Sequence, residues 1–413
     1  MFEDRVRTRT LSNGVRVISE QVGYVDSISV GIWVKVGSRD EQKQYQGISH
    51  FIEHMMFKGT ERRDAKTIAD EIESRGGNLN AFTDKEYTCY YAKALAEHAD
   101  IVVDVLSDMI LHSKHDSEEL ARERNVVLEE IKRYKDTPDD TVHDLFAQTI
   151  WAGHPLGRSV IGLDKTVRGL EREHLMEYIR NNYTPDRTVL SVAGNVEFDK
   201  VVELAETRLG EMMGSSSRKY GKSPQYTRKN KLQRKSTEQV HFCLGCQGFK
   251  ETDETRYPLV ILDTVLGGNM SSRLFQEIRE KRGLAYAIGS YGVSYGDGGL
   301  FTVYGGTSPD TFDQVVELTR LELNKVRKEG LTEQEITKAK TQIKGAMTLG
   351  MENMSSRMMR MGKSMLYYDR FVSLNEILGK IQAVTSKDII MTAENLFNEE
   401  NMTLAAIGPF KSI

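Results

Sequence analysis

The chain has 413 residues, and a usual domain size of about 100–200 residues predicts roughly two to three domains. Hydrophobic residues make up 39% and charged residues 28%, which is typical of a globular protein with a sizeable core. The 56 Lys and Arg residues nearly balance the 60 Asp and Glu residues, and the formal net charge is −4. This balance gives no reason to expect nucleic acid or an anionic membrane as a partner.

The first residues, MFEDRVRTRTLSNG, contain acidic side chains and no apolar run, so no secretory signal is expected. No stretch of about 18 uninterrupted apolar residues occurs, so no membrane-spanning helix is predicted. Three cysteines are too few for a disulfide framework in a chain of this size. These features predict a soluble protein of a reducing compartment, by default the cytoplasm.

The first half of the chain predicts alternating strands and helices. Asn13-Gly14 suits a tight hairpin turn, and residues 28–36 alternate apolar and polar side chains as in a half-buried strand. The segment QGISHFIEHMMFKGT (46–60) then predicts a helix, and a second helix near 64–75 ends at a Gly-Gly pair. Further along, the sequence predicts a strand in 78–95, long helices over about 96–135 and a strand over 187–196.

The second half repeats this order. Residues 213–232 are polar and contain Ser and Gly clusters, which predicts a linker between an N-terminal domain, 1–212, and a C-terminal domain, 233–413. The strand QVHFCLGCQGF parallels SISVGIWVKVG, and the helix in RYPLVILDTVLGG parallels the one in QGISHFIEHMMFKG. We therefore predict an α+β fold of two similar domains from a duplication, each a mostly antiparallel sheet flanked by helices.

Two further patterns have structural interpretations. Cys243 and Cys246 form a CxxC within an alternating strand pattern, where a spacing of three places them on opposite faces, so we interpret them as structural. A stripe of methionines has helical period and predicts a helix packed against its own sheet rather than a peptide-binding surface. Its members are Met347, Met351, Met354, Met358, Met361 and Met365.

His50, Glu53 and His54 are the strongest indication of chemistry. On a helix, positions i, i+3 and i+4 share one face, so two imidazoles one turn apart can reach one zinc ion at about 2.0–2.1 Å. The order HxxEH is the inverzincin signature. The flanking residues are largely apolar, which predicts a buried helix in which charged groups need partners or a metal. The alternative is a helix with two ordinary histidines.

A catalytic zinc requires a third protein ligand, which spacing alone does not identify. Several carboxylates are available, namely Glu71, Glu73, Glu123, Glu129 and Glu130. Glu123 and Glu130 share one helical face two turns apart, whereas Glu129 points about 100° away from Glu130.

The sequence resembles the pitrilysin/insulinase family of zinc peptidases, and most closely its short two-domain members. These include bacterial processing-peptidase-like proteases and the β subunit of mitochondrial processing peptidase. The resemblance covers nearly the whole chain and is carried by RTLSNGVRVISE, GISHFIEHMMFKGT, GGNLNAFTDKEYTCYYAK, ERNVVLEEI, HPLGRSVIG, NYTPDRTVLSVAGNV and SSRLFQEIREKRGLAYAIGSY. It implies the processing-peptidase/LuxS-like metallohydrolase fold and a bacterial, cytoplasmic zinc metalloendopeptidase.

By this resemblance, His50, His54 and Glu130 are the ligands of one zinc ion per chain. Glu123 is a carboxylate behind the ligands that orients the site. Glu53 is then left as the general base, which accepts a proton from the attacking water and passes it to the leaving amine.

The resemblance also implies substrate contacts and an assembly. Arg279 and Tyr286 match a catalytic arginine–tyrosine pair that contacts substrate opposite the zinc. Asn80, Ala81 and Phe82 match a strand edge along which peptides are added as a further strand. The short members form dimers that enclose a chamber, which implies a homodimer in which Arg279 and Tyr286 of one chain face the zinc of the other. Oligopeptides and unfolded polypeptides are the expected substrates.

Two alternatives compete with an active peptidase. A non-catalytic structural or partner subunit of a processing-peptidase-like complex usually lacks zinc ligands, whereas the complete set is present here. A small lyase that also uses HxxEH is far shorter and needs a cysteine near the zinc. Cys89, on a predicted strand, is a poor candidate for that cysteine.

Overall fold

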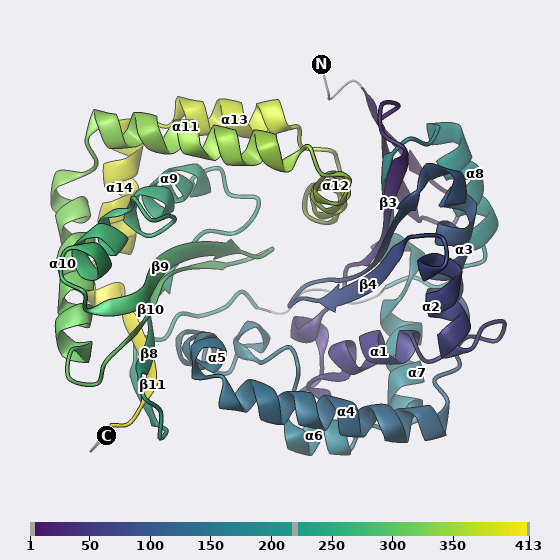
Figure 1. Ribbon diagram of the computed structural model, residues 1–413, viewed down its shortest axis with the longest axis horizontal. Helices are drawn as coiled ribbons and strands as arrows, with labels where there is room; N and C mark the ends of the chain where they lie inside the picture. The colour runs from purple at the N-terminus through teal and green to yellow at the C-terminus, as the bar shows by residue number, and fades with distance from the viewer. Residues whose placement is uncertain (1–4, 217–221, 411–413) are drawn as a thin grey trace. The chain divides into compact units, whose positions relative to one another are not determined.

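The computed structural model describes residues 5–216 and 222–410, which form two compact units, each built on one β-sheet (Figure 1). The first unit comprises the described residues within 1–132, 159–219 and 349–373. The second comprises those within 133–158, 220–348 and 374–413. None of the described helices is long and apolar enough to cross a membrane.

The sheet of the first unit has the strand order β1-β2-β6-β3-β5-β4. All neighbouring strands are antiparallel except β2 and β6. Its strands are β1 (Val6–Thr10), β2 (Arg16–Gln21), β3 (Ser27–Val34), β4 (Asn78–Thr83), β5 (Thr88–Leu95) and β6 (Thr188–Gly194). Its helices are α1 (Ile48–Met56), α2 (Ala65–Glu73), α3 (Ala99–His112), most of α4 (Ser117–Asp136), α6 (Asp164–Arg168), α7 (Arg172–Asn182), α8 (Phe198–Leu209) and α12 (Met354–Tyr368).

The sheet of the second unit has the order β7-β11-β8-β10-β9, again with one parallel pair, β7 and β11. Its strands are β7 (Asn230–Arg234), β8 (Val240–Gln247), β9 (Ala285–Ser294), β10 (Gly299–Thr307) and β11 (Thr403–Gly408). Its helices are α5 (Pro138–Ile150), α9 (Arg256–Leu266), a π-helix (Phe275–Glu280), α10 (Phe312–Glu329), most of α11 (Glu333–Gly350), α13 (Leu374–Ala383) and α14 (Ser386–Leu396). Short 3-10 turns lie at Ser38–Asp40, Lys43–Tyr45, Ala96–His98, Pro155–Gly157, Pro185–Arg187 and Glu399–Asn401.

The two sheets confirm the predicted pair of similar, mostly antiparallel α+β units. The order β2-β6-β3-β5-β4 in the first sheet corresponds position by position to β7-β11-β8-β10-β9 in the second, and both orders begin with the parallel pair. Helix α1 follows β3 just as α9 follows β8. A shared strand order with the same crossover is the expected product of a duplication.

The units differ from the predicted contiguous domains because each half of the chain contributes one helix to the unit that is formed mainly by the other half. Helices α1, α2, α3 and α8 pack on one face of the first sheet, while α12, from the second half of the chain, covers the opposite face (Figure 1). Helix α5, from the first half, packs on the second sheet in the same way. The predicted linker, 213–232, includes 217–221, which lie outside the described residues, and its last residues already belong to β7.

The alternation of residues predicted that β3 is half-buried. Helix α12 explains why both faces of this strand are buried instead. Trp33 and Ser29, on the face that was expected to be exposed, are fully buried. The Ser191 hydroxyl of β6 donates to the Met358 carbonyl of α12 over 2.8 Å, and a Cβ added at Gly31 would lie 2.4 Å from Met358 Sδ. The strand therefore requires glycine where α12 crosses it.

The methionine stripe is also corrected. It is divided between two helices, because α11 ends at Gly350 and α12 begins at Met354. Met358, Met361 and Met365 are buried against the first sheet rather than the sheet of their own half.

One other predicted element is broken by a turn. The single strand predicted over 78–95 is the hairpin β4–β5, with Asp84 N donating to Tyr87 O at its turn. The long helices predicted within 96–135 are α3 and α4, and His115 between them has a left-handed φ of 46°. The hairpin at Asn13-Gly14 and the strand within 187–196 are confirmed.

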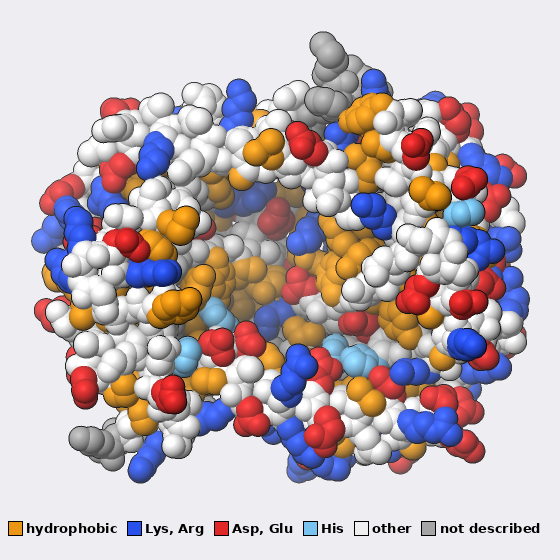
Figure 2. Space-filling model, viewed as in Figure 1, with side chains coloured by type: hydrophobic (Ala, Val, Ile, Leu, Met, Phe, Trp, Pro, Cys, Tyr) orange, Lys and Arg blue, Asp and Glu red, His pale blue; other side chains and the backbone are white. Residues whose placement is uncertain are grey.

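Cys243 and Cys246 lie on β8 and are buried on its opposite faces, which confirms the structural interpretation. Burial raises the pKa of both thiols, that of Cys246 to about 12. On the face drawn in Figure 2, basic and acidic side chains are interspersed without a large area of one sign, in keeping with the balanced composition.

Candidate metal centre

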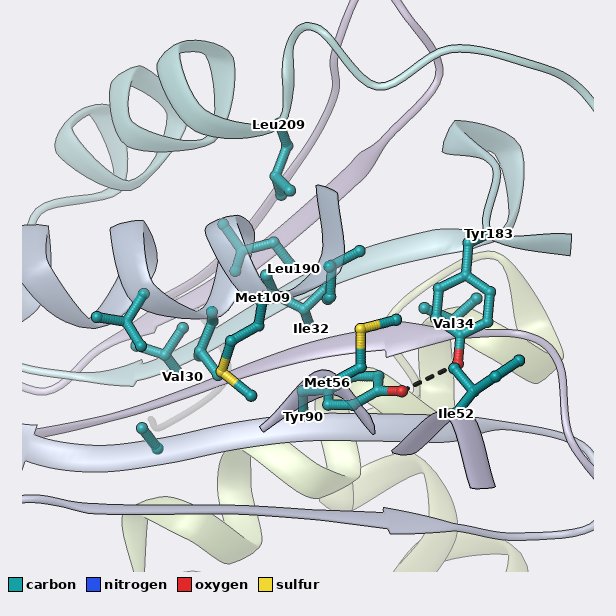
Figure 3. Packing of buried hydrophobic residues seen from close by; sticks show 14 of the residues in the cluster. Val30, Ile32, Val34, Ile52, Met56, Tyr90, Met109, Tyr183, Leu190 and Leu209 are labelled. Carbon is teal, nitrogen blue, oxygen red and sulfur yellow. Dashed lines mark hydrogen bonds between the residues drawn. The ribbon is translucent and has the colours of Figure 1, made fainter. Parts of the chain in front are cut away.

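Helix α1 is fixed in place from both its end and its apolar side. The Glu41 carboxylate accepts hydrogen bonds from the backbone N–H groups of Gly47 (2.8 Å) and Ser49 (2.9 Å), which satisfies donors that a helix start leaves unpaired. Ile52 and Met56 are fully buried in the core of the first unit. Figure 3 shows these side chains in the same cluster as Tyr90 and Tyr183, whose hydroxyl groups point toward one another at 3.0 Å. The polar face of α1 is thereby directed away from the core.

Three possible ligands converge on that polar face. His50 Nε2 lies 3.8 Å and His54 Nε2 3.5 Å from the same oxygen of Glu130, on α4. The ring centroids of the two histidines are 4.6 Å apart. Two ligands at about 2.0–2.1 Å from a tetrahedral zinc lie roughly 3.3 Å from each other. The donor atoms, all within 4.8 Å of one another, therefore fit one zinc ion after small adjustments.

The other carboxylates considered from the sequence are engaged elsewhere or face away. Glu71 accepts a hydrogen bond from Arg63 Nε over 3.0 Å. Glu129 is an exposed side chain that accepts from Lys132 Nζ over 2.6 Å. Glu73 is exposed on α2. Among the described His, Cys, Asp and Glu residues, the cluster that could hold a metal is His50, His54 and Glu130.

Glu123 lies behind His54 and is buried. Its Oε1 is 2.9 Å from His54 Nδ1, and its Oε2 is 2.6 Å from Lys58 Nζ. A ligand histidine that bonds a carboxylate through its second nitrogen is held in one orientation and one tautomer. The sequence predicted this role for Glu123 but missed Lys58, whose place in FKGT just after the helix carried no recognisable signal.

The two histidines have opposite electrostatic surroundings. Burial, together with neighbouring His54, lowers the pKa of His50 to about 4, so this ring is neutral near pH 7, as a metal ligand must be. Burial also opposes the charged form of His54, but hydrogen bonds to Glu123 and Glu130 outweigh it and raise the pKa of His54 to about 9. Binding of a metal ion at His54 would therefore displace a proton near pH 7.

Glu53 lies on the same helix face as the two histidines and is half-buried. Burial raises the pKa of its carboxyl group, and a hydrogen bond from Thr83 opposes that rise. Thr83 Oγ1 donates to Glu53 Oε2 over 2.5 Å. Sequence reasoning missed Thr83, although it directly follows the three predicted substrate-binding residues.

Those three residues lie in β4, which forms the edge of the first sheet and pairs with β5. Asn80 is exposed, and its Oδ1 accepts from Ala81 N over 2.8 Å. Phe82 packs edge-to-face on Trp33, with centroids 5.8 Å apart, and so faces the α12 side of the sheet. Ala81 packs against the main core on the opposite side. The side chains of Phe82 and Ala81 therefore both pack within the first unit, on opposite faces of the strand.

Arg279 and Tyr286 are brought together in the second unit. The Arg279 guanidinium carbon lies 5.0 Å from the ring centroid of Tyr286 and 4.7 Å from that of Phe275. Tyr286 is 77% exposed although it is a large aromatic residue on β9. Arg279 lies in the π-helix, a rare conformation that is frequent at functional sites.

Comparisons with known proteins cover nearly the whole chain. Residues 16–164 match the family model "Insulinase (Peptidase family M16)", and residues 169–343 match "Peptidase M16 inactive domain". An uncharacterized zinc protease of Bacillus subtilis is 42% identical over 98% of both chains. One from Streptomyces coelicolor is 40% identical over 98% of this chain and 90% of its own.

Solved structures agree with the fold. A peptidase M16 inactive domain from Pseudomonas fluorescens superimposes with a TM-score of 0.92 over 98% of both chains at 17% identity. A protease from Helicobacter pylori has a TM-score of 0.90 at 22% identity, over 97% of this chain and 99% of its own. The family models, the full-length relatives and the shared architecture show that the chain belongs to the insulinase family, peptidase family M16.

Proposed function

We propose that this chain is a zinc-dependent endopeptidase with a single zinc ion held by His50, His54 and Glu130. The observation that carries the proposal is the convergence of these three donor groups beside the half-buried carboxylate of Glu53. The relatives named zinc proteases support the same metal and the same class of reaction. When bound, zinc lowers the pKa of a water molecule toward about 7 and polarises a peptide carbonyl.

Glu53 acts as the general base. Its carboxylate is one helical turn or less from both histidine ligands, yet it is not needed to complete the ligand set. It accepts the proton of the attacking water, whose oxygen bonds to the carbonyl carbon, and passes that proton to the nitrogen of the leaving amine as the C–N bond breaks. Glu123 and Lys58 hold His54 in the orientation that ligation requires.

Substrate binds as an extended strand along the edge of β4, at Asn80, Ala81 and Phe82. Main-chain hydrogen bonds to such an edge give affinity with little dependence on side chains, which suits oligopeptides and unfolded polypeptides. The Arg279 guanidinium and the Tyr286 hydroxyl supply donors for substrate and for the developing oxyanion. We propose a homodimer with a closed chamber, in which this pair of one chain serves the zinc of the other. A cytoplasmic location stays a prediction.

The test compares turnover and zinc content in the wild type and three variants. Wild-type protein should cleave a quenched fluorescent oligopeptide, and Glu53→Gln should keep its zinc but lose activity by at least about a hundredfold. Glu130→Gln should lose zinc. Glu129→Gln, which changes the exposed neighbour of Glu130 on the same helix, is the matched control and should behave as wild type. Zinc-loaded wild type without turnover on any peptide would refute the peptidase, and a full zinc content in Glu130→Gln would refute the ligand set.

A further inference from the structure

Thr83 is the last residue of β4, and its hydroxyl group contacts the Glu53 carboxylate. Its hydroxyl donates to Oε2 over 2.5 Å. This contact joins two parts of the first unit that are far apart in sequence, the zinc-ligand helix and the edge strand.

The contact restricts a side chain that would otherwise be mobile. A glutamate has three side-chain torsions, and fixing them has an entropic cost. With Oε2 held by Thr83, the carboxylate has one defined position and its Oε1 is left for proton transfer. Because proton transfer depends steeply on distance, a base that is held in place reacts faster than one that samples several rotamers.

Thr83 is itself rigidly placed. It pairs with Thr88 across the β4–β5 turn, and its β-branched side chain has few allowed rotamers. The turn is fastened to the loop before α1, since Ser38 N donates to Asp84 O (3.2 Å) and Arg39 N donates to Lys85 O (2.9 Å). The position of the Thr83 hydroxyl group is therefore set by the position of strand β4.

We propose that Thr83 is the positioning residue of the general base, and that a peptide seated along β4 aligns Glu53 through it. The inference rests on the proposed function of the site. It makes the edge strand more than a docking surface, because the strand that binds the substrate backbone ends in the hydroxyl group that holds the base. The effect is on the rate of the chemical step rather than on zinc binding.

Thr83→Val and Thr83→Ser test the hydroxyl directly. Valine keeps the β-branched shape without the hydroxyl, and serine keeps the hydroxyl without the methyl group. Thr83→Val should lower kcat about 10- to 100-fold with KM within about twofold, while Thr83→Ser should recover kcat to within about threefold of wild type. Zinc content and the thermal unfolding midpoint, which do not depend on turnover, should stay close to wild type in both.

Two controls separate positioning from general damage. Thr207→Val removes an exposed hydroxyl that bonds a carbonyl of its own helix, Glu203 O, and should change nothing. In a Glu53→Gln background, Thr83→Val should cause little further loss, because the two residues act as one unit.

The outcomes distinguish this inference from the proposed function. Active wild type together with a fully active Thr83→Val variant overturns the positioning role alone. A Thr83→Ser variant as slow as Thr83→Val also overturns it, since packing and not the hydroxyl would then matter. Zinc-loaded wild type without peptidase activity overturns both.

Discussion

Lys58 and Glu123 form an ion pair of 2.6 Å directly behind His54. The second oxygen of the Glu123 carboxylate lies 2.9 Å from His54 Nδ1. Lys58 therefore holds Glu123 in place, and Glu123 in turn orients His54, a proposed zinc ligand. Glu123 is 5% exposed, and its pKa is lowered because hydrogen bonds to His54 and Lys58 outweigh the effect of burial. The charge of Lys58 keeps this carboxylate ionised and ready to accept from the ring.

We expect Lys58→Met to weaken zinc binding by about tenfold, the lower end of the effect of losing a group that supports a ligand. Methionine keeps the length of the side chain and removes its charge. Zinc affinity would be measured by competition with a chelator, starting from metal-free protein. Lys66→Met, at an exposed position on α2, should bind zinc as wild type does. Equal affinities in the two variants would exclude a role for Lys58.

Gly362→Ala should destabilise the protein by about 1–3 kcal/mol, because the new methyl group has no room. A Cβ at this position of α12 would lie 2.3 Å from the buried indole of Trp33. The free energy of unfolding would be measured by urea denaturation. Gly379→Ala, in α13, meets nothing within 4 Å and should instead stabilise its helix by about 0.5–1 kcal/mol. A Gly362→Ala variant as stable as wild type would show that α12 can move away from β3.

His115 predicts a loss of stability in mild acid. It is 3% exposed, and burial, assisted by the charge of Arg172, lowers its pKa to about 4. The unfolded chain takes up a proton below about pH 6.5, whereas the folded chain does not until about pH 4. The stability that neutral His115 contributes is therefore complete above pH 6.5 and is lost as the pH falls from 6.5 toward 4, by about 2 kcal/mol at pH 5.

His115→Asn isolates this contribution, since asparagine tolerates the left-handed backbone at this position. Urea unfolding at pH 7.5 and 5.0 should show that wild type loses about 2 kcal/mol more than the variant. If the two proteins lose the same amount, another group causes the acid sensitivity.

The three cysteines should be inert in the native protein. All are fully buried, and burial raises the pKa of each thiol. Cys243 lies 3.5 Å from His143 Nδ1, but without solvent access the thiolate that reacts with electrophiles is not formed. A chromogenic thiol reagent should therefore titrate no thiol in the folded protein and three in guanidinium. Rapid reaction of one native thiol would mean that a sheet opens locally.

Much of the site could be predicted from the sequence because its central part is local. His50, Glu53 and His54 share one helix face by spacing alone, whereas Glu130 was selected among five glutamates only through the family resemblance. Thr83 and Lys58 escaped prediction for a different reason. Each acts through a single polar contact with a residue distant in sequence, and an isolated Thr at the end of a strand or Lys after a helix has no pattern that indicates such a partner.

The sequence by itself determined the hairpin at Asn13-Gly14, the succession of strand, helix, helix and strand in each half, and the duplication, because periodicity and turn residues report local backbone preferences. Only the tertiary structure decided which element covers each face. Alternation showed that one face of β3 is apolar, but Trp33 and Gly31 on the other face became core only when α12 packed there. Hydrophobic burial is not directional. An apolar stripe therefore predicts that a face will be buried, but the packing of the whole chain decides which element covers that face.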